Sequence, residues 1–332
     1  MSRPGLLLIL LFGPLLLPAQ DQAYHRTLKL MGCRFDFTVV AADEAHGTEY
    51  LDLAIDEIRR IERLISSWDP HSQTSEINRQ AGVTPVAVDP ELYGLIERSV
   101  GISRLTDGSF DITYASVDKL WYFDGSMTSM PEPDAVAASV ALIGYRKIEL
   151  DPATHSVYLP ERGMKIGFGA IGKGYAADRA RELLEARGVT AGIVNASGDL
   201  TAWGRQPDGS DWKVAITNPL NKQKAFAWLP VDGRAVVTSG DYERYVIFDG
   251  VRYAHIIDPR TGYPATGIIS ATVFAPRAEL ADALATSIFV MGTETGIDFV
   301  DQLPGVDVII VDDANRVHAS TGIDLENPAN DE

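Results

Sequence analysis

The segment Cys33-Arg34-Phe35-Asp36-Phe37-Thr38-Val39-Val40 alternates between apolar and polar side chains. A period of two predicts a β-strand with one face buried. We place this strand over residues 28–40, with the Met31-Gly32 pair near its start. From Thr48 to Ser66 apolar residues recur at helical spacing, which predicts an amphipathic helix that ends before Pro70.

Strands and helices follow one another irregularly over the rest of the chain, and residues 69–82 are predicted as a polar loop. The absence of a regular strand–helix–strand rhythm favours the α+β class over a doubly wound sheet. We find neither an internal repeat nor a linker, which favours one domain over residues 21–323, in one or two lobes, followed by a polar tail over 324–332. Further helices are predicted over residues 90–105, 174–187 and 279–291, and strands over 148–159 (a hairpin), 164–168, 193–195, 212–216, 225–230, 245–248, 269–274 and 308–311.

Composition limits the classes of function. The 332 residues, 45% of them hydrophobic, suffice for a sizeable core. The formal net charge of −17 argues against a general affinity for nucleic acid or for an anionic membrane. With Cys33 as the only cysteine, an intramolecular disulfide and a cysteine-based zinc site are both excluded.

The first 20 residues have the pattern of a secretory signal. Arg3 is followed by an apolar run from Leu6 to Leu17 and by Pro18-Ala19-Gln20, a plausible cleavage zone. The run is too short to span a membrane, which takes about 20 residues, and no later stretch is long and apolar enough. We therefore expect an exported protein, located in the periplasm and either free or associated with the inner membrane.

The stretch from Tyr253 to Pro264 places four reactive groups within seven positions. They are the imidazole of His255, the carboxylate of Asp258, the guanidinium of Arg260 and the hydroxyl of Thr261. Two prolines and a glycine predict a turn, and the Ile-Ile pair after His255 indicates a strand end that brings the imidazole to a cleft. The residues alone leave two interpretations open, a functional histidine or a structural turn with a hydrogen-bonded one.

Glycines surround Lys173 in the segment Gly167-Phe168-Gly169-Ala170-Ile171-Gly172-Lys173-Gly174. A Walker motif is excluded because glycine follows the lysine where serine or threonine must stand, and the acidic residue that a dinucleotide fold requires about 20 positions later is missing. A glycine turn before a helix still offers N–H groups and a positive helix end to an anion. We favour a phosphate contact here over a plain tight turn.

The last long predicted helix carries Asp282 and Thr286, whose oxygens share one face because they are four residues apart. The helix is otherwise apolar, and an unpaired buried carboxylate would be costly. Oxygen ligands of this kind suit Mg²⁺. The alternative is that Asp282 pairs with a buried arginine.

These motifs together, in this order, resemble the ApbE family of FAD:protein FMN transferases over about residues 27–318. The resemblance rests on Met31-Gly32, Ser67-Trp68, Asp107-Gly-Ser-Phe-Asp-Ile-Thr113, Gly169-Ala-Ile-Gly-Lys-Gly-Tyr-Ala-Ala-Asp178, Thr238-Ser239-Gly240, His255-Ile-Ile-Asp-Pro-Arg-Thr-Gly262 and Ala281-Asp-Ala-Leu-Ala-Thr286.

The resemblance implies a T-fold-like architecture of mixed, largely antiparallel sheets packed with helices. It also implies a reaction in which Mg²⁺ assists cleavage of FAD, and FMN passes to a threonine or serine of an exported or membrane-anchored acceptor with release of AMP. Expected acceptors are subunits of ion-pumping, flavin-dependent redox complexes. By the same resemblance, His255 is the base, Ala170, Asp282, Ala285 and Thr286 hold the metal, and the FAD site comprises Met31, Trp68, Ser109, Phe110, Asp111, Gly167, Lys173, Thr238, Ser239, Gly240, Ile256 and Ile257.

Two positions depart from the family pattern. Gly167 stands where an acidic residue is usual, and Cys33 stands where threonine is usual after Met-Gly. Neither position belongs to the implied metal site or base, so the activity remains the expectation, with altered flavin affinity. Two alternatives remain open, an FAD pyrophosphatase that yields FMN and AMP, and a non-catalytic exported flavin-binding protein.

Overall fold

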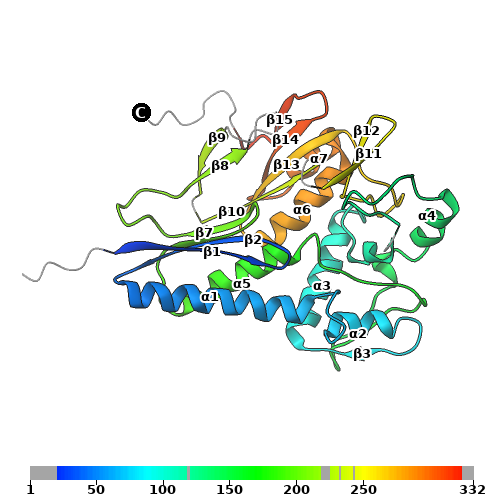
Figure 1. The fold of residues 1–332 in the computed structure, drawn as a ribbon, viewed down its shortest axis with the longest axis horizontal. Coiled ribbons are helices and arrows are strands. Elements are labelled where there is room, and N and C mark those ends of the chain that lie inside the picture. Colours follow the sequence, from blue (N-terminus) through cyan, green and yellow to red (C-terminus); the bar gives the residue numbers. More distant parts are fainter. Residues whose placement is uncertain (1–20, 118–119, 218–224, 232, 242–243, 324–332) are drawn as a thin grey trace, which may run out of the picture.

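An eight-stranded antiparallel sheet forms the centre of the molecule, in the order β1-β2-β6-β7-β10-β13-β14-β15 (Figure 1). The computed structural model describes residues 21–323 apart from 118–119, 218–224, 232 and 242–243, so the predicted signal segment 1–20 and the predicted tail 324–332 lie outside the described residues. The sheet confirms the predicted α+β class with largely antiparallel strands. Its strands are β1 (Gln22–Leu30), β2 (Cys33–Ala41), β6 (Gly192–Ala196), β7 (Asp199–Trp203), β10 (Ala235–Gly240), β13 (Ile268–Ala275), β14 (Asp307–Asp312) and β15 (Val317–Ala319).

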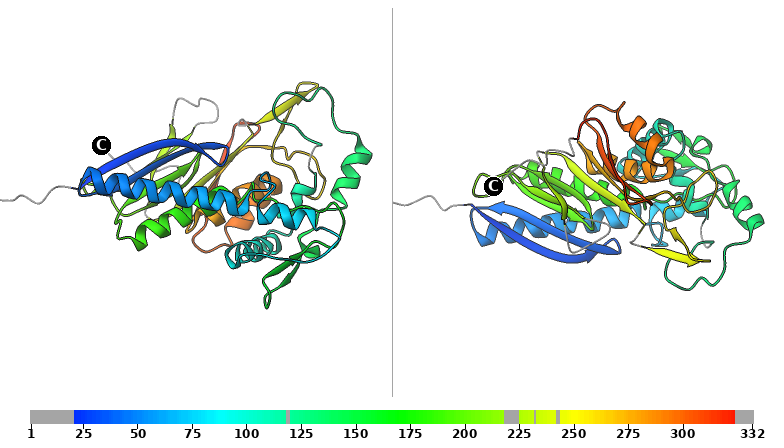
Figure 2. Two further views of the ribbon diagram at one scale, coloured as in Figure 1. Left: turned by 60° about the horizontal axis from the view of Figure 1, so that its bottom comes forward. Right: turned by 90° about the horizontal axis from the view of Figure 1, so that it is seen from above.

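Three long helices cover one face of this sheet, as Figures 1 and 2 show. They are α1 (Glu44–Ile65), α5 (Gly172–Ala186) and α6 (Ala278–Met291). The core between helices and sheet contains fully buried Phe35 and Phe37 from the alternating segment of β2. The other face is covered by the ribbon of β8 (Lys213–Thr217) and β9 (Ala225–Pro230), where Trp212 packs into a second, smaller core.

No helix in the described ranges is both long enough and apolar enough to cross a membrane.

Shorter elements surround the large sheet and its three helices. The remaining elements are the helices α2 (Gln73–Arg79), α3 (Pro90–Leu105), α4 (Pro133–Val140) and α7 (Thr293–Val300), the 3₁₀ turns η1 (Ile112–Val117) and η2 (Tyr145–Lys147), the small sheet of β3 (Val86–Ala87), β4 (Glu149–Asp151) and β5 (Ser156–Tyr158), and the hairpin of β11 (Tyr245–Phe248) and β12 (Val251–Ala254).

Two tight hairpin turns lie side by side at one end of the sheet. Met31 and Gly32 have φ values of 47° and 76° and join β1 to β2, so the predicted strand over residues 28–40 is in fact two strands. Ser197 and Gly198, with φ values of 53° and 106°, join β6 to β7. Positive φ at both central positions is typical of type I′ turns. The Ser197 hydroxyl ties the turns together, because it accepts from the Arg34 N–H (3.1 Å) and donates to the Arg34 carbonyl (3.0 Å).

Two predicted segments differ from the structure. Residues 164–168 form no strand, because their backbone bonds to separate partners rather than to one neighbouring strand. The Asn78 side chain pairs with both backbone groups of Ile166, and the Gly167 N–H donates to the Ile112 carbonyl at 2.9 Å. The predicted loop over 69–82 contains helix α2, which the Ser72 side chain caps by accepting from the Ser75 N–H.

Candidate active site

A cavity of about 580 Å³, here called the site cavity, lies beside the two hairpin turns. Segments from every part of the chain contribute to it, including the end of α1, the start of α5, the end of β10 and one face of α6. The residues that line it and were predicted from the sequence are Met31, Trp68, Ser109, Phe110, Asp111, Ala170, Lys173, Thr238, Ser239, Gly240, His255, Ile256, Ile257, Asp282 and Thr286. Its volume is typical of pockets that hold a small organic ligand.

Gly167 and Ala285 are the two predicted site residues that do not line the cavity. The Gly167 N–H donates to the Ile112 carbonyl, and an ideal Cβ at this position would lie 3.2 Å from the Cβ of Ala115, a tight contact. Ala285 is fully buried on α6, directly before Thr286. The neighbours of Gly167, Phe168 and Gly169, line the cavity instead.

His255 is the first residue after β12, so a strand end does bring the imidazole to the cavity. The ring packs edge-on against Phe123, and the Nδ1 atom is buried with no hydrogen bond to any described residue. Burial, and then the positive charge of Arg244, lower the pKa of His255 to about 4. The imidazole is consequently neutral at physiological pH and has a lone pair available for a proton.

Asp258 and Arg260 serve the turn rather than the imidazole. The Asp258 carboxylate accepts from the backbone N–H, Nε and Nη2 of Arg260, each at 2.9 Å. The Trp121 indole donates to the Gly262 carbonyl at 2.9 Å and fixes the far end of the turn. Each of the two interpretations left open by the sequence therefore holds for one part of the segment. Asp258 and Arg260 stabilise the turn, whereas His255 faces the cavity.

Lys173 and Asp199 form an ion pair at the wall of the cavity, with 2.5 Å between Nζ and Oδ2. Asp199 is almost completely buried at the first position of β7, and burial raises its pKa. Burial and the nearby negative charge of Asp199 also raise the pKa of Asp282, to about 7. The sequence analysis missed Asp199 because a single aspartate after a Ser-Gly turn carries no local pattern.

The N-terminus of α5 is occupied by the protein itself. Asp282 Oδ2 accepts from the Gly174 N–H at 3.0 Å, and the Lys173 N–H contributes to the same carboxylate. The Gly172 and Tyr175 N–H groups donate to backbone carbonyls of Phe168 and Ile171. These N–H groups are therefore already bonded within the protein, whereas Gly169, Ala170 and Lys173 of the same segment line the cavity, and the predicted phosphate contact of this segment stays a prediction.

The site fits a divalent cation. Asp282 and Thr286 line the cavity from one face of α6, and Ala170 lines it nearby. Two buried carboxylates, Asp199 and Asp282, share the single ammonium of Lys173, so the ionised cluster carries an excess negative charge. No three His, Cys, Asp or Glu residues gather into a metal-binding group in the described part of the chain. A metal with few protein carboxylates and several oxygens from water or phosphate is typical of Mg²⁺.

The predicted alternative for Asp282, a buried arginine partner, does not occur among the described residues. Arg277, next to the start of α6, pairs with Glu182 at 2.8 Å and with Asp178 at 3.5 Å. Asp282 thus keeps its carboxylate within the cavity wall.

Several other lining residues hold the walls in place. The Asp111 carboxylate accepts from the Thr113 N–H and hydroxyl (2.8 and 2.7 Å) and from the Tyr145 N–H (2.7 Å), so it serves the loop around it. The Thr238 hydroxyl bonds that of Thr272 at 2.9 Å. Trp68, in contrast, is 88% exposed at the mouth of the cavity, where its ring is free to contact a planar ligand.

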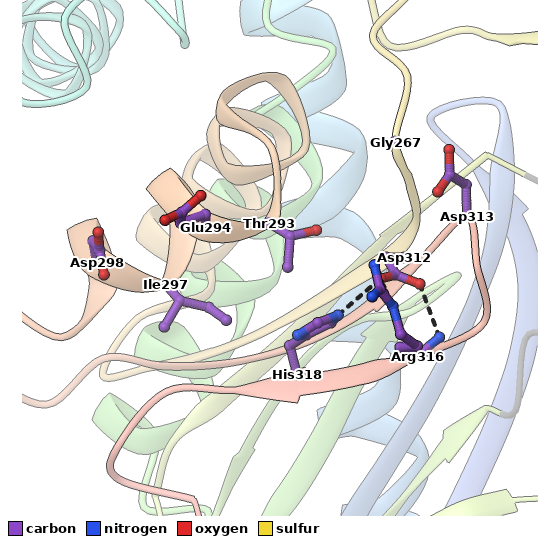
Figure 3. A pocket seen from close by; sticks show the side chains of 9 residues that line it. All are labelled: Gly267, Thr293, Glu294, Ile297, Asp298, Asp312, Asp313, Arg316 and His318. Atoms are coloured by element: carbon purple, nitrogen blue, oxygen red, sulfur yellow. Dashed lines mark hydrogen bonds and ion pairs between the residues drawn. The ribbon is translucent and has the colours of Figure 1, made fainter.

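A second cavity, of about 480 Å³, lies between α7 and the β14–β15 hairpin (Figure 3). Its central group, Asp312, accepts from Arg316 Nε at 2.8 Å, and its Oδ2 lies 2.9 Å from His318 Nε2. The His318 and Arg316 contacts hold the pKa of Asp312 well below its usual range. Because these side chains satisfy one another and close the hairpin, we assign this cavity a structural role.

The sequence of the chain matches that of a known protein family. The model of the ApbE family matches residues 31–310. The FAD:protein FMN transferase of Treponema pallidum is 36% identical over 323 residues, which cover 92% of this chain and 89% of that protein.

Solved structures show the same fold. The ApbE protein of Thermotoga maritima superimposes with a TM-score of 0.83 at 32% identity, covering 91% of this chain and 98% of that one. The apo form of the flavinyl transferase ApbE from Pseudomonas stutzeri superimposes with a TM-score of 0.81 at 27% identity, covering 91% and 96%. This chain therefore belongs to the ApbE family of flavin transferases.

Proposed function

We propose that the protein is a Mg²⁺-dependent FAD:protein FMN transferase. It cleaves the pyrophosphate of FAD, joins FMN through a phosphoester to a threonine or serine hydroxyl of an acceptor protein, and releases AMP. The observation that carries this proposal is the pairing, in one cavity, of a neutral imidazole with an oxygen-ligand site. His255 lines the cavity that Asp282 and Thr286 line from α6. The relatives that share the fold carry the name of this reaction.

In this reaction the residues of the protein would accept a proton and orient the two substrates, FAD and the acceptor hydroxyl. His255 accepts the proton of the acceptor hydroxyl as its oxygen bonds to the phosphorus of the FMN half, and the bond from that phosphorus to the AMP oxygen breaks. Such general-base assistance is typically worth a factor of about 10²–10⁴ in rate. Asp282, Thr286 and the Ala170 carbonyl would hold the metal. Mg²⁺ bound there supplies positive charge that polarises the phosphoryl oxygens and stabilises the departing AMP.

The location and the acceptor belong to the same proposal. The signal-like segment of residues 1–20 supports export to the periplasm. We expect the acceptor there, as an exported or membrane-anchored protein such as a subunit of an ion-pumping redox complex.

The test is incubation of the purified protein with FAD, Mg²⁺ and a candidate acceptor. Flavin fluorescence that stays with the acceptor after denaturation, with a mass gain of one FMN unit and release of AMP, supports the transferase. FMN and AMP free in solution, with an unmodified acceptor, would indicate a pyrophosphatase. Unchanged FAD across a panel of exported flavin-dependent redox proteins would indicate a binding protein.

A further inference from the structure

We propose that Arg244 binds the pyrophosphate of FAD on the His255 side of the site cavity, opposite the metal-ligand face of α6. This inference rests on the proposed function, since it assigns a residue to the binding of that reaction's substrate. Arg244 lies outside every motif that the sequence analysis used.

The β11–β12 hairpin holds Arg244 next to His255. Tyr245, the first residue of β11, pairs with Ala254, the last residue of β12. Arg244 and His255 are therefore the next residues outward on the two strands, and the His255 N–H donates to the Arg244 carbonyl at 3.0 Å. Both line the site cavity. A ligand that reaches the imidazole must therefore pass close to the Arg244 side chain.

Among the described residues, none neutralises the positive charge of Arg244 through a hydrogen bond or an ion pair. The other cation that lines the cavity, Lys173, is paired with the buried Asp199, and the positive end of α5 is capped by Asp282. The guanidinium of Arg244 makes no hydrogen bond or ion pair within the described ranges of the chain. Its charge reaches the site, because it contributes to the lowered pKa of His255.

A guanidinium that no described side chain pairs with suits a phosphate in this position. The chain has a net charge of −17, so an anion with two charged phosphates enters the cavity only where positive charge is concentrated. Guanidinium N–H groups match phosphate oxygens in pairs, with stronger bonds than neutral donors make. Arg244 would thus hold one phosphate while the metal ligands Asp282 and Thr286 face the other side of the same group.

The experiment compares ligands with and without phosphate. Dissociation constants for FAD, ADP and riboflavin are measured by flavin fluorescence and calorimetry, without Mg²⁺ so that FAD stays intact. For Arg244→Gln we expect FAD and ADP to bind about 10- to 100-fold more weakly, as loss of charge-assisted hydrogen bonds predicts. Riboflavin, which has no phosphate, should bind as it does to the wild type. Arg244→Lys keeps the charge but loses the paired geometry. Its affinities for FAD and ADP should lie between those of the wild type and of Arg244→Gln.

The matched control is Arg252→Gln. Arg252 lies on the same hairpin but is paired with Asp241 at 3.3 Å and stacks over Tyr245, so its loss should leave all three affinities within twofold. Unfolding temperatures of both variants, expected within a few degrees of the wild type, show that the fold is intact.

Some outcomes would overturn the proposal. If Arg244→Gln weakened riboflavin as much as FAD, Arg244 would serve the flavin or the shape of the cavity. Unchanged FAD and ADP affinities in Arg244→Gln would also reject the role of Arg244 in phosphate binding. In that case, FMN transfer by the wild type would still support the proposed function. Conversely, a wild type that binds FAD but never transfers FMN would reject the function, and the ligand comparison would still decide the role of Arg244. A wild type that binds neither FAD nor ADP would reject both.

Discussion

At the scale of single residues, the charge state of each group follows from its surroundings. His255 is half-buried near two cations, Arg244 and Lys173, and stays neutral. Asp282 lies buried beside a second carboxylate, Asp199, and its pKa rises. The pKa values of the proposed base and of the proposed metal ligand are thus shifted in opposite directions within one cavity, as expected where one group must accept a proton and the other must bind a cation.

Replacement of His255 by alanine tests the base directly. We expect the rate of FMN transfer to fall by about 10²–10⁴-fold, because the acceptor hydroxyl loses the group that takes its proton. The affinity for FAD should change by less than about threefold, since the phosphates and the flavin keep their other contacts. His25→Ala, on the exposed side of β1, is the control and should transfer normally. Transfer at the wild-type rate by His255→Ala would remove His255 as the base.

The pH dependence of transfer follows from the lowered pKa of His255, about 4. The base acts when neutral, so activity is present above this pKa and is lost as pH falls through it. At saturating Mg²⁺ we expect kcat/KM for FAD to be nearly constant from pH 8 down to about 5.5. A histidine with an ordinary pKa of about 6.5 would already have lost most of its activity at pH 5.5. A half-maximal rate near pH 6.5 would contradict the effect of burial and of the Arg244 charge on His255.

Residues with a motif could be predicted from the sequence, and residues without one could not. His255, Lys173 and Asp282 each stand in a recognisable turn or helix pattern, and all three line the cavity. Asp199 and Arg244 have no such pattern, since their partners are 26 and 11 positions away and meet them only in the folded sheet and hairpin. Local spacing carries no information about such contacts.

At the scale of elements, α5 and α6 position the proposed metal-ligand face of α6 by capping each other. The Asp178 carboxylate of α5 accepts from the Ala278 and Glu279 N–H groups at the start of α6, both at 3.0 Å. Asp282 of α6 accepts in return from the Gly174 N–H at the start of α5. The helices cross so closely that a Cβ on Gly174 would lie 2.1 Å from the Ala278 carbonyl oxygen. The glycine after Lys173 is thus required by packing.

Gly174→Ala tests this crossing. The added methyl overlaps backbone that has little room to move, so we expect a loss of about 2–4 kcal/mol in the free energy of unfolding, by analogy with overpacked cores. The affinity for Mg²⁺ should weaken as well, because Asp282 must shift with the helix. Gly101→Ala is the control, since an ideal Cβ there meets nothing within 4 Å in the exposed surface of α3. It should stabilise by up to about 1 kcal/mol. Equal stabilities of the two variants in urea unfolding would contradict the close crossing.

Elements whose sequences carry a clear helical, alternating or continuous apolar pattern were the ones that the sequence predicted well. Helices α3 and α6 lie within one residue of the predicted ranges, and β2 shows the predicted alternation of burial. Strand β7 is buried at all five positions, so it has no alternating pattern, and β10 shows only a partial one. Both were missed because their short sequences mix apolar with polar or small residues, so neither an alternation nor a continuous apolar run stands out.

At the scale of the whole molecule, the site lies where one sheet end, two hairpin turns and three helices converge, and this convergence depends on strand order. The order places β2 beside β6 and β10 beside β13, pairings between segments far apart in the sequence. The sequence was enough to predict the α+β class and the resemblance to the ApbE family. The order of the strands could not be predicted from local patterns, because it depends on long-range packing. The consequence is a buried cluster of carboxylates inside the core, whose ionisation is coupled to the stability of the entire chain.

That coupling predicts how stability responds to pH and to Mg²⁺. The pKa of Asp282 is raised in the folded state to about 7, from 3.8. The folded protein thus holds this proton more tightly than the unfolded chain, and metal-free stability should fall as pH rises from about 4 to 7. At the proposed site Mg²⁺ would bind the ionised carboxylate, so its effect on stability should have the opposite dependence on pH. We expect the rise in unfolding temperature on addition of Mg²⁺ to be small at pH 5.5 and to increase up to about pH 7.5, because each pH unit below the pKa weakens apparent binding by up to about tenfold.

The variant Asp282→Asn isolates the contribution of this carboxylate to the dependence of stability on pH and on Mg²⁺. The amide is nearly isosteric and uncharged, so the variant should lose both the Mg²⁺-dependent rise in unfolding temperature and the part of the metal-free pH dependence that Asp282 causes. Asp298→Asn, an exposed carboxylate on the adjacent α7, should keep both responses. Scanning calorimetry of the three proteins at pH 5.5, 6.5 and 7.5, with and without Mg²⁺, measures the effect without any turnover. If Asp282→Asn retained the wild-type response to Mg²⁺, the cation would bind elsewhere than at Asp282.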